Sequence, residues 1–382
     1  MPAEVLVNAR ARIGRRLIRA LDRLVAASDT VVLASFPDLE DNVVALLRSH
    51  EAEQRRVVVL ADDVRAARRR ADALGLKVSI TRRDHVVGLW TFLRSHTVIT
   101  THGLFRSGRR PRGKRHVGLW HGEYIKAVGR VVGEDTHLVD SMVVSGNLSR
   151  LIRSAETGID PSRVHVLGVP RADLLQVDSG PPPRVLMWAP TYRASTRGDQ
   201  RQDTDPHSFE NFVRNAITHL EPVLEEHDAE LWLRLHPSAA GGFGVTSPRV
   251  VMADDQWLGQ MGVTLYEALG ATRALITDYS SIWIDYLNLD RPIVGAVPDL
   301  DEYEAGRGLL LKPYDWWLPG PTCRTVDSLV GAVRRILGGH DDESAHRRLI
   351  RSLLIESLER PATESVWDLV AEGPAAKSCA RH

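Results

Sequence analysis

Short runs of β-branched and other apolar residues alternate along the chain with longer segments that have the periodicity of helices. The runs form two series: residues 30–35, 56–61, 77–80, 97–100, 116–120 and 140–146, and then residues 184–190, 230–237, 249–253, 274–278 and 292–297. Between the series, residues 176–184 read QVDSGPPPR, and consecutive prolines cannot continue a helix or a central strand. Strands that alternate with helices form parallel sheets covered on both faces. The pattern therefore predicts an α/β fold of two Rossmann-like domains facing each other across a cleft.

The same pattern divides the chain into parts, because 382 residues are enough for two hydrophobic cores. We expect a basic amphipathic helix at 1–28, an N-terminal Rossmann-like domain at 29–176, a C-terminal Rossmann-like domain at 184–340, C-terminal helices at 341–371 and a disordered tail at 372–382. The proline-rich segment at 176–184 is then the linker between the two domains.

Two segments are rich in arginine. In the N-terminal helix, Ile13, Leu17, Leu21 and Leu24 share one helical stripe with arginines around it. Such a helix can lie on anionic lipid or pack on its own domain, and the pattern leaves both interpretations open. The cluster at 105–116 is either a solvated loop or an electropositive rim for a phosphorylated or lipid-linked partner.

The overall composition limits the partners and the compartment. Forty-nine basic and 49 acidic residues cancel, so the net charge gives no argument for nucleic acid. The two cysteines cannot form a disulfide framework, which favours a reducing compartment. Arginines interrupt every apolar run near the N-terminus, and no uncharged stretch is long enough to cross a bilayer. We therefore expect a cytoplasmic protein, peripheral on the inner face of the cell membrane.

Polar residues directly follow several of the predicted strands. Ligands of parallel sheets bind beyond the carboxyl ends of the strands, so these residues are candidates for the site. They are His102, His121 and Lys126, Thr191 and Arg193, His236, and Asp278 with Ser280 and Ser281. The recurrence of hydroxyls, imidazoles and cations at strand ends is stronger evidence for a site than any single motif.

These residue types indicate a phosphate compound as the ligand. A histidine can accept a proton from an attacking hydroxyl or donate a hydrogen bond to phosphate, and the guanidinium fork matches phosphate geometry. The chain contains no GxGxxG, GxxxxGK[ST] or GxSxG motif. Its histidines are not at zinc spacing, so we expect neither a metal nor a cofactor.

The segment TDYSS at 277–281 has two interpretations. A helix that begins at the serines offers unpaired N–H groups and hydroxyls that can hold an anion. Serine and aspartate are also the ordinary capping residues of helices, so the segment by itself indicates only a helix start.

Several motifs together resemble those of the CDP-glycerol glycerophosphotransferases, the teichoic acid primases and polymerases and related capsule enzymes. They are GLWHGEYIKAVG (118–129), VLGVPRADLL (166–175), APTYR (189–193), LRLHP (233–237), LITDYSSIWIDYL (275–287), RP (291–292) and RG (307–308). The motifs occur in the order of that family and extend over most of the chain. The combination is specific, although each motif alone is weak.

The resemblance implies a GT-B enzyme without a catalytic metal. It would transfer glycerol phosphate from CDP-glycerol to an acceptor hydroxyl on a lipid-linked glycan or a growing teichoic acid or capsule chain, and release CMP. The roles that it implies are general base for His121, a second essential histidine near the donor phosphates for His236, donor binding for Thr191, Arg193, Ser280 and Ser281, and orientation of the loop for Asp278. For His102 and Lys126, their positions after predicted strands indicate acceptor or phosphate binding.

Two departures from the family pattern affect the acceptor side. Glu123, Tyr124 and Ile125 precede Lys126 where the family has a proline, and THGLF at 101–105 carries an unexpected histidine. The acceptor can therefore differ from the commonest ones.

Trp283 is expected to be a packing residue. The open alternatives are a CDP-ribitol or nucleotide-sugar donor, a non-catalytic GT-B module, and a membrane-peripheral scaffold.

Overall fold

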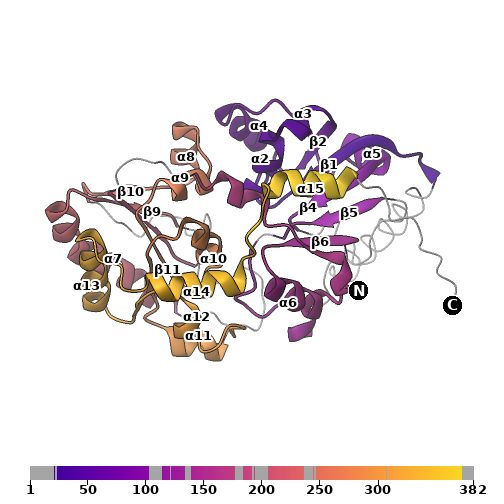
Figure 1. The fold of residues 1–382 in the computed structure, drawn as a ribbon. Helices are drawn as coiled ribbons and strands as arrows, with labels where there is room; N and C mark the ends of the chain where they lie inside the picture. The colour runs from indigo at the N-terminus through magenta and orange to yellow at the C-terminus, as the bar shows by residue number, and fades with distance from the viewer. Residues whose placement is uncertain are drawn as a thin grey trace, which may run out of the picture. The chain divides into compact units, whose positions relative to one another are not determined.

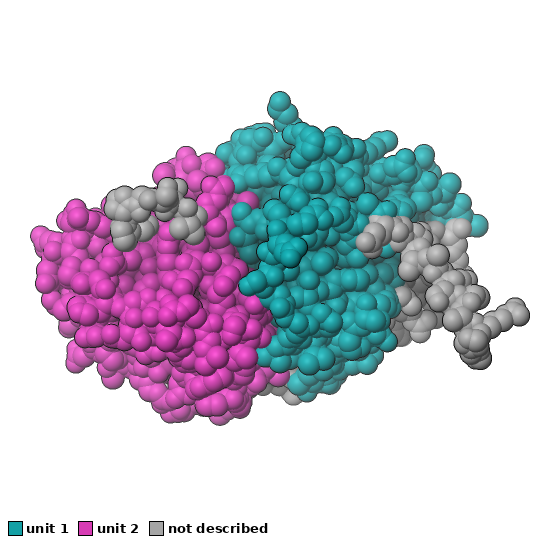
Figure 2. Space-filling view, in the orientation of Figure 1, with its two compact units in different colours: residues 1–121, 129–173, 356–382 teal, residues 122–128, 174–355 magenta. Residues whose placement is uncertain are grey.

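The computed structural model describes residues 21, 24–102, 114–120, 122–133, 139–176, 184–191, 193, 205–235, 244, 247–306 and 308–371. The chain forms two compact units (Figure 1; Figure 2). Unit 1 comprises residues 1–121, 129–173 and 356–382, and unit 2 comprises residues 122–128 and 174–355. The predictions for His121, His236, most of the N-terminal helix, most of the basic cluster at 105–116, the prolines of the linker and the C-terminal tail lie outside the described residues.

Unit 1 is built on a seven-stranded sheet in which every neighbouring pair is parallel. The strands are β1 (Ser28–Ala34), β2 (Arg56–Ala61), β3 (Ser79–Arg82), β4 (Ser95–Thr100), β5 (Arg115–Gly118), β6 (Ser141–Val144) and β7 (Val164–Val166). Their spatial order is β3-β2-β1-β4-β5-β6-β7. The order reverses between β1 and β4, and this topological switch point is where open α/β sheets bind ligands.

Helices cover the sheet of unit 1 (Figure 1). They are α2 (Asp41–Arg48), α3 (His50–Glu53), α4 (Val64–Ala73), α5 (Val86–Arg94), α6 (Asn147–Thr157) and α15 (Ala362–Ala371), with 3₁₀ turns η1 (Gly129–Val132), η2 (Pro161–Arg163) and η3 (Pro170–Leu174). Helix α15 joins this unit from the far end of the chain. The Asp173 carboxylate accepts hydrogen bonds from Ala362 N at 3.0 Å and Thr363 N at 2.8 Å, which satisfies N–H groups that begin the helix.

Unit 2 is built on a six-stranded sheet, also parallel throughout. The strands are β8 (Val185–Ala189), β9 (Glu230–Leu233), β10 (Val250–Met252), β11 (Ala274–Thr277), β12 (Ile293–Ala296) and β13 (Thr322–Cys323). Their order is β10-β9-β8-β11-β12-β13, with the switch point between β8 and β11. The helices are α7 (Pro206–Glu226), α8 (Asp255–Met261), α9 (Leu265–Gly270), α10 (Ile282–Tyr286), α11 (Leu300–Gly306), α12 (Tyr314–Trp317), α13 (Val326–Leu337) and α14 (Ser344–Leu354), with the 3₁₀ turn η5 (Leu287–Leu289).

The core of unit 2 shows how the sequence selects these elements. Helix α7 begins at Pro206, and the Asp205 side chain caps it by accepting from the N–H groups of the first turn. Residues at helical spacing, including Val213 and Leu220, are fully buried in the same cluster as Leu231 of the neighbouring strand β9. The 3.6-residue periodicity of the helix and the continuous apolar run of the strand therefore meet in one core.

The predicted α/β fold class with two Rossmann-like domains is confirmed, and each predicted strand run contains a strand. The sequence analysis did not predict β7 and β13, which are edge strands of three and two residues. It also did not assign residues 122–128 to the second unit or α15 to the first. The predicted domain boundaries stay predictions.

The described end of the N-terminal segment packs on unit 1. Val25 N donates to Leu21 O at 3.0 Å, and both side chains contact the buried cluster that contains Val32 and Phe92. Leu24, on the same predicted stripe, is 80% exposed. Of the two described residues of the apolar stripe, Leu21 packs on unit 1 and Leu24 faces solvent. Among the described residues, no helix combines the length and apolar character needed to cross a bilayer.

Candidate functional site

The switch point of unit 2 brings together two of the predicted site residues. Thr191 follows β8, Asp278 follows β11, and these two strands are neighbours. The Asp278 carboxylate is fully buried, and it accepts hydrogen bonds from Thr191 N at 2.9 Å and Thr191 Oγ1 at 2.6 Å. Asp278 therefore ties the two strand ends together, and its predicted role in orienting the loop for a donor stays a prediction.

Arg193 is held in the interior of this site. Its Nη1 donates to Asp278 Oδ2 at 2.6 Å, and its Nε donates to Asp299 Oδ2 at 2.9 Å. The guanidinium also lies 3.8 Å from the centroid of the Phe209 ring, and the side chain is 1% exposed. Burial alone would lower the pKa of Arg193, but the two carboxylates outweigh it and raise the pKa above its ordinary value. Arg193 is thus a charged internal clamp between the loops that follow β8, β11 and β12.

Aromatic side chains support the loop that carries Asp278. The Tyr279 hydroxyl donates to Asp299 Oδ1 at 2.9 Å, and its ring stacks on Tyr303 with centroids 3.8 Å apart. The Tyr314 hydroxyl donates to the main-chain oxygen of Asp278. Burial and the Asp299 carboxylate raise the pKa of Tyr279, so this hydroxyl keeps its proton and its role as donor. The backbone that leads into Ser280 and Ser281 is therefore fixed on both sides.

Ser280 and Ser281 are half-buried at the start of α10. Ser281 occupies the N-cap position, but its side chain makes no capping hydrogen bond. Within the described part of the chain, neither hydroxyl contacts a hydrogen-bond partner, so side-chain capping does not explain the pair. Helix α10 has only five residues, which limits any helix-dipole contribution. The site therefore offers two available hydroxyls at a switch point rather than a strong helix terminus.

Residues 122–128 place part of the WHG motif in unit 2. A Cβ at Gly122 would lie 2.6 Å from Ser281 Oγ, so these two residues are in direct contact. Further along, Lys126 pairs with Leu309 in an antiparallel bridge, and Lys126 Nζ lies 5.7 Å from the centroid of the Tyr303 ring. Lys126 was predicted to bind the acceptor or a phosphate, and the structure places it in unit 2, which also carries the predicted donor site.

His102 is the one described candidate in unit 1. It follows β4, and its Nδ1 lies 3.0 Å from Thr101 Oγ1. The rings of His102 and Phe36 form a T-shaped pair with centroids 5.7 Å apart. Thr191, Arg193, Asp278, Ser280, Ser281 and Lys126 lie in unit 2, whereas His121 and His236 are outside the described residues.

Asp299 is a site residue that the sequence analysis missed. It follows β12 by three positions, and the rule that selected the other strand ends could have selected it. Trp283, fully buried behind the loop, is a packing residue as predicted.

The described end of the basic cluster belongs to the interior of unit 1. Lys114 Nζ donates to Leu93 O at 2.5 Å and to Ser95 O at 2.9 Å, and Arg115 donates to Leu369 O. Because these two cations bind main-chain carbonyls, neither of the predicted interpretations of the cluster, a solvated loop or an electropositive rim, describes them.

Within the described residues, no group of three or more His, Cys, Asp and Glu side chains has the arrangement of a metal site.

Comparison with known proteins gives a consistent family match. The family model described as CDP-Glycerol:Poly(glycerophosphate) glycerophosphotransferase matches residues 17–372. A teichoic acid ribitol-phosphate primase of Bacillus spizizenii is 29% identical over 163 residues, which are 42% of this chain and 35% of that protein. A teichoic acid poly(glycerol phosphate) polymerase of the same organism is 23% identical over 163 residues, 42% of this chain and 38% of that protein. The matches thus span little more than a third of these relatives.

Among solved structures, a variant of the wall teichoic acid polymerase TagF, from a crystal soaked with CDPG, has the same fold. The TM-score is 0.73 at 16% sequence identity, and the match covers 97% of this chain and 95% of that chain. The fold is therefore that of the GT-B class, as predicted.

Proposed function

Because the chain belongs to the CDP-glycerol:poly(glycerophosphate) glycerophosphotransferase family, we propose that it transfers glycerol phosphate from CDP-glycerol to an acceptor hydroxyl and releases CMP. The observation that carries this proposal is the switch point of unit 2. There, Asp278 joins the ends of β8 and β11, and the next residues present the hydroxyls of Ser280 and Ser281. A nucleotide diphosphate bound at this edge would meet donors for its oxygens.

On the donor side, the residues divide into binding and positioning groups. Ser280 and Ser281 donate hydrogen bonds to the diphosphate of the donor. Asp278 and Arg193 hold the two loops in place, because their charges are already paired in the interior. Thr191 contributes through its bonds to Asp278. Preorganised donors of this kind stabilise charge that develops on phosphoryl oxygens.

On the acceptor side, His121 accepts the proton of the attacking hydroxyl. The oxygen forms a bond to the glycerol-bearing phosphorus, the bond from that phosphorus to CMP breaks, and His236 stabilises the charge on the phosphates. The contact between Gly122 and Ser281 supports this assignment, since Gly122 directly follows His121 in the chain. The Ser281 hydroxyl and the residue that follows the proposed base are therefore in contact.

The acceptor is a lipid-linked or polyol-phosphate molecule, and the protein works in the cytoplasm on the inner face of the membrane. The arginine-rich segment before residue 28 supports the membrane part of this proposal. A CDP-ribitol donor is the second candidate, because one relative is a ribitol-phosphate primase and another a glycerol phosphate polymerase.

The test is a donor screen with the purified full chain. CDP-glycerol, CDP-ribitol and nucleotide sugars are each incubated with a synthetic lipid-linked acceptor, and CMP release and product mass are followed. We expect CMP release and a product heavier by glycerol phosphate. His121→Ala and His236→Ala should each lower turnover about 100-fold or more while the fold is retained. A product containing ribitol phosphate would favour the second candidate, and no product from any donor would support the non-catalytic alternative.

A further inference from the structure

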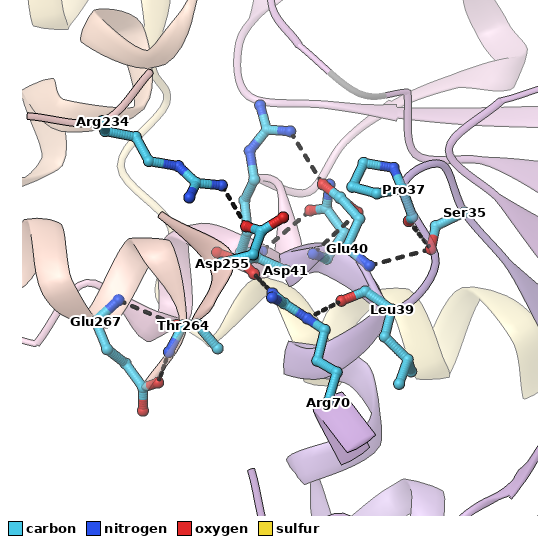
Figure 3. A network of polar contacts seen from close by, with 12 residues as sticks. Ser35, Pro37, Leu39, Glu40, Asp41, Arg70, Arg234, Asp255, Thr264 and Glu267 are labelled. Atoms are coloured by element: carbon cyan, nitrogen blue, oxygen red, sulfur yellow. Dashed lines mark hydrogen bonds and ion pairs between the residues drawn. The ribbon is translucent and has the colours of Figure 1, made fainter. Parts of the chain in front are cut away.

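The switch point of unit 1 also carries a polar constellation, in the loop between β1 and α2. Ser35 Oγ accepts from Glu40 N at 3.1 Å and donates to Pro37 O at 2.9 Å, so the loop folds back on itself (Figure 3). This fold places Glu40 beyond the carboxyl end of β1, where β1 and β4 are neighbours. By the rule for parallel sheets, this is the edge where a ligand of unit 1 would bind.

The Glu40 carboxylate is oriented by three hydrogen bonds. Oε1 accepts from Asn42 Nδ2 at 2.8 Å and from Arg171 Nη1 at 3.5 Å, and Oε2 accepts from Asn42 N at 3.1 Å. A carboxylate has about four acceptor positions, so a position on Oε2 remains. The side chain is 13% exposed, and the Arg171 side chain behind it is 4% exposed. Glu40 is therefore a fixed carboxylate with capacity for one more donor.

The helix itself does not require a glutamate at this position. Glu40 is the N-cap of α2, a role for which Ser, Thr, Asp and Asn are preferred. Aspartate side chains cap α4, α7 and α8 in this protein, and threonines cap α9 and α13. Burial raises the pKa of Glu40 to about 7 against the opposing effect of Arg171, so its negative charge is costly to the fold. A costly charge at a ligand-binding edge is a candidate for function.

An exposed aromatic ring lies in the same loop. Phe36 is 60% exposed, and its N–H donates to Thr101 Oγ1 at 3.4 Å. Its ring forms a T-shaped pair with the His102 ring. An aromatic face packs against the C–H groups of a polyol or sugar, and a carboxylate accepts hydrogen bonds from its hydroxyls. In its ionised form a carboxylate repels phosphate, so Glu40 fits a neutral, hydroxyl-bearing part of a ligand, and the exposed ring in the same loop is available for the C–H groups of that part.

We propose that Glu40 binds a hydroxyl of the acceptor, with Phe36 packed against the acceptor's C–H face. This inference rests on the proposed function, and it identifies the part of the acceptor that unit 1 recognises as a neutral polyol or sugar unit. Glu40 is on this account a residue for acceptor specificity, and it has no contact with the donor.

The test compares Glu40→Gln with wild type in the full chain, using CDP-glycerol and the synthetic lipid-linked acceptor. We expect the KM for the acceptor to rise about 10-fold or more, with the KM for CDP-glycerol unchanged. Glu40→Ser keeps a capping side chain and should show the same loss, which separates binding from helix stability. The matched control is Asp63→Asn, which alters the cap of α4 in the same unit and should leave both KM values unchanged. An unchanged acceptor KM in Glu40→Gln, or an equal rise in Asp63→Asn, overturns the inference.

A second measurement separates this inference from the proposed transfer. Calorimetry without donor measures binding of a synthetic poly(glycerol phosphate) oligomer with free terminal hydroxyls to wild type, Glu40→Gln and Phe36→Ala. Binding to wild type that weakens in both variants supports the inference even where no transfer is detected. Equal binding to all three proteins, or no binding to wild type, overturns it, whatever the transfer assay shows.

Discussion

Gly122 contacts Ser281 so closely that a Cβ on residue 122 would lie 2.6 Å from the Ser281 hydroxyl oxygen. Gly122→Ala should therefore force Ser281 Oγ out of its position. The backbone of residue 122 is not in the left-handed region, so alanine itself causes no strain there. We expect the KM for CDP-glycerol to rise about 10-fold with a small change in stability.

The double variant Gly122→Ala/Ser281→Ala shows whether the effect passes through Ser281. It should be no worse than Ser281→Ala alone, because residues in contact are not additive. Gly331→Ala in α13 is the control, since nothing lies within 4 Å of its Cβ position. Additive losses in the double variant would contradict the explanation.

Asp278→Asn should destabilise unit 2. The change removes one of the two carboxylates that neutralise the buried Arg193 guanidinium. Breaking a buried ion pair from one side costs about 3–5 kcal/mol, and the remaining Asp299 places the expected loss near the lower value. Urea unfolding at pH 7 measures it.

Asp301→Asn is the matched control for this change. Asp301 pairs with Arg324 on the surface, where both side chains are more than half exposed, so its loss should leave the unfolding midpoint unchanged. Equal midpoints for Asp278→Asn and wild type would show that the Arg193 clamp is not needed for stability.

The clamp also shows which parts of the site the sequence could predict. Thr191 and Asp278 were found because they directly follow apolar runs, and the parallel sheet brings such ends together. Arg193 was expected to bind the donor, since a guanidinium at a strand end matches phosphate. Its burial depends on Asp299, 106 residues further along the chain, and on the Phe209 ring of α7. Contacts of that range arise from packing and leave no local pattern.

The same reasoning applies to the fold. Central strands are buried on both faces and appear as continuous apolar runs, so they were predicted. The edge strands β7 and β13 were missed because neither contains a continuous apolar run: His165 interrupts β7, and β13 has only two residues, one of them a threonine. Helix α15 is a recognisable helix, but its place in unit 1 depends on the contact of Asp173 with its first residues and of Trp367 with α2. Glu40 escaped the strand-end rule because it lies six residues beyond β1.

Cys323 should be an unreactive thiol in the folded protein. It lies in β13, is 2% exposed, and burial raises its pKa to about 11. In a Cys379→Ser background, a thiol reagent at pH 8 should label the native protein very slowly and the protein in guanidinium fully. Rapid stoichiometric labelling without denaturant would mean that β13 opens readily.

Glu40 should make the stability of unit 1 depend on pH with the opposite sign to an ordinary paired carboxylate. Its pKa is about 7 in the folded protein and 4.5 ordinarily, because burial outweighs Arg171 and the neighbouring Asp41 adds repulsion. Between these pH values the unfolded chain loses the proton first, so the folded state binds more protons and stability falls as pH rises. The shift corresponds to at most about 3 kcal/mol, reached above pH 7.

Glu40→Gln removes this titration and is the variant that tests it. The free energy of unfolding of Glu40→Gln, relative to wild type, should increase from pH 5 to pH 8 in urea unfolding. The Asp63 carboxyl has a lowered pKa in the wild-type protein, so Asp63→Asn should show no such increase. A constant difference between wild type and Glu40→Gln across this range would mean that the carboxylate ionises at its ordinary pKa. The cost of its charge would then no longer support a role in binding the acceptor.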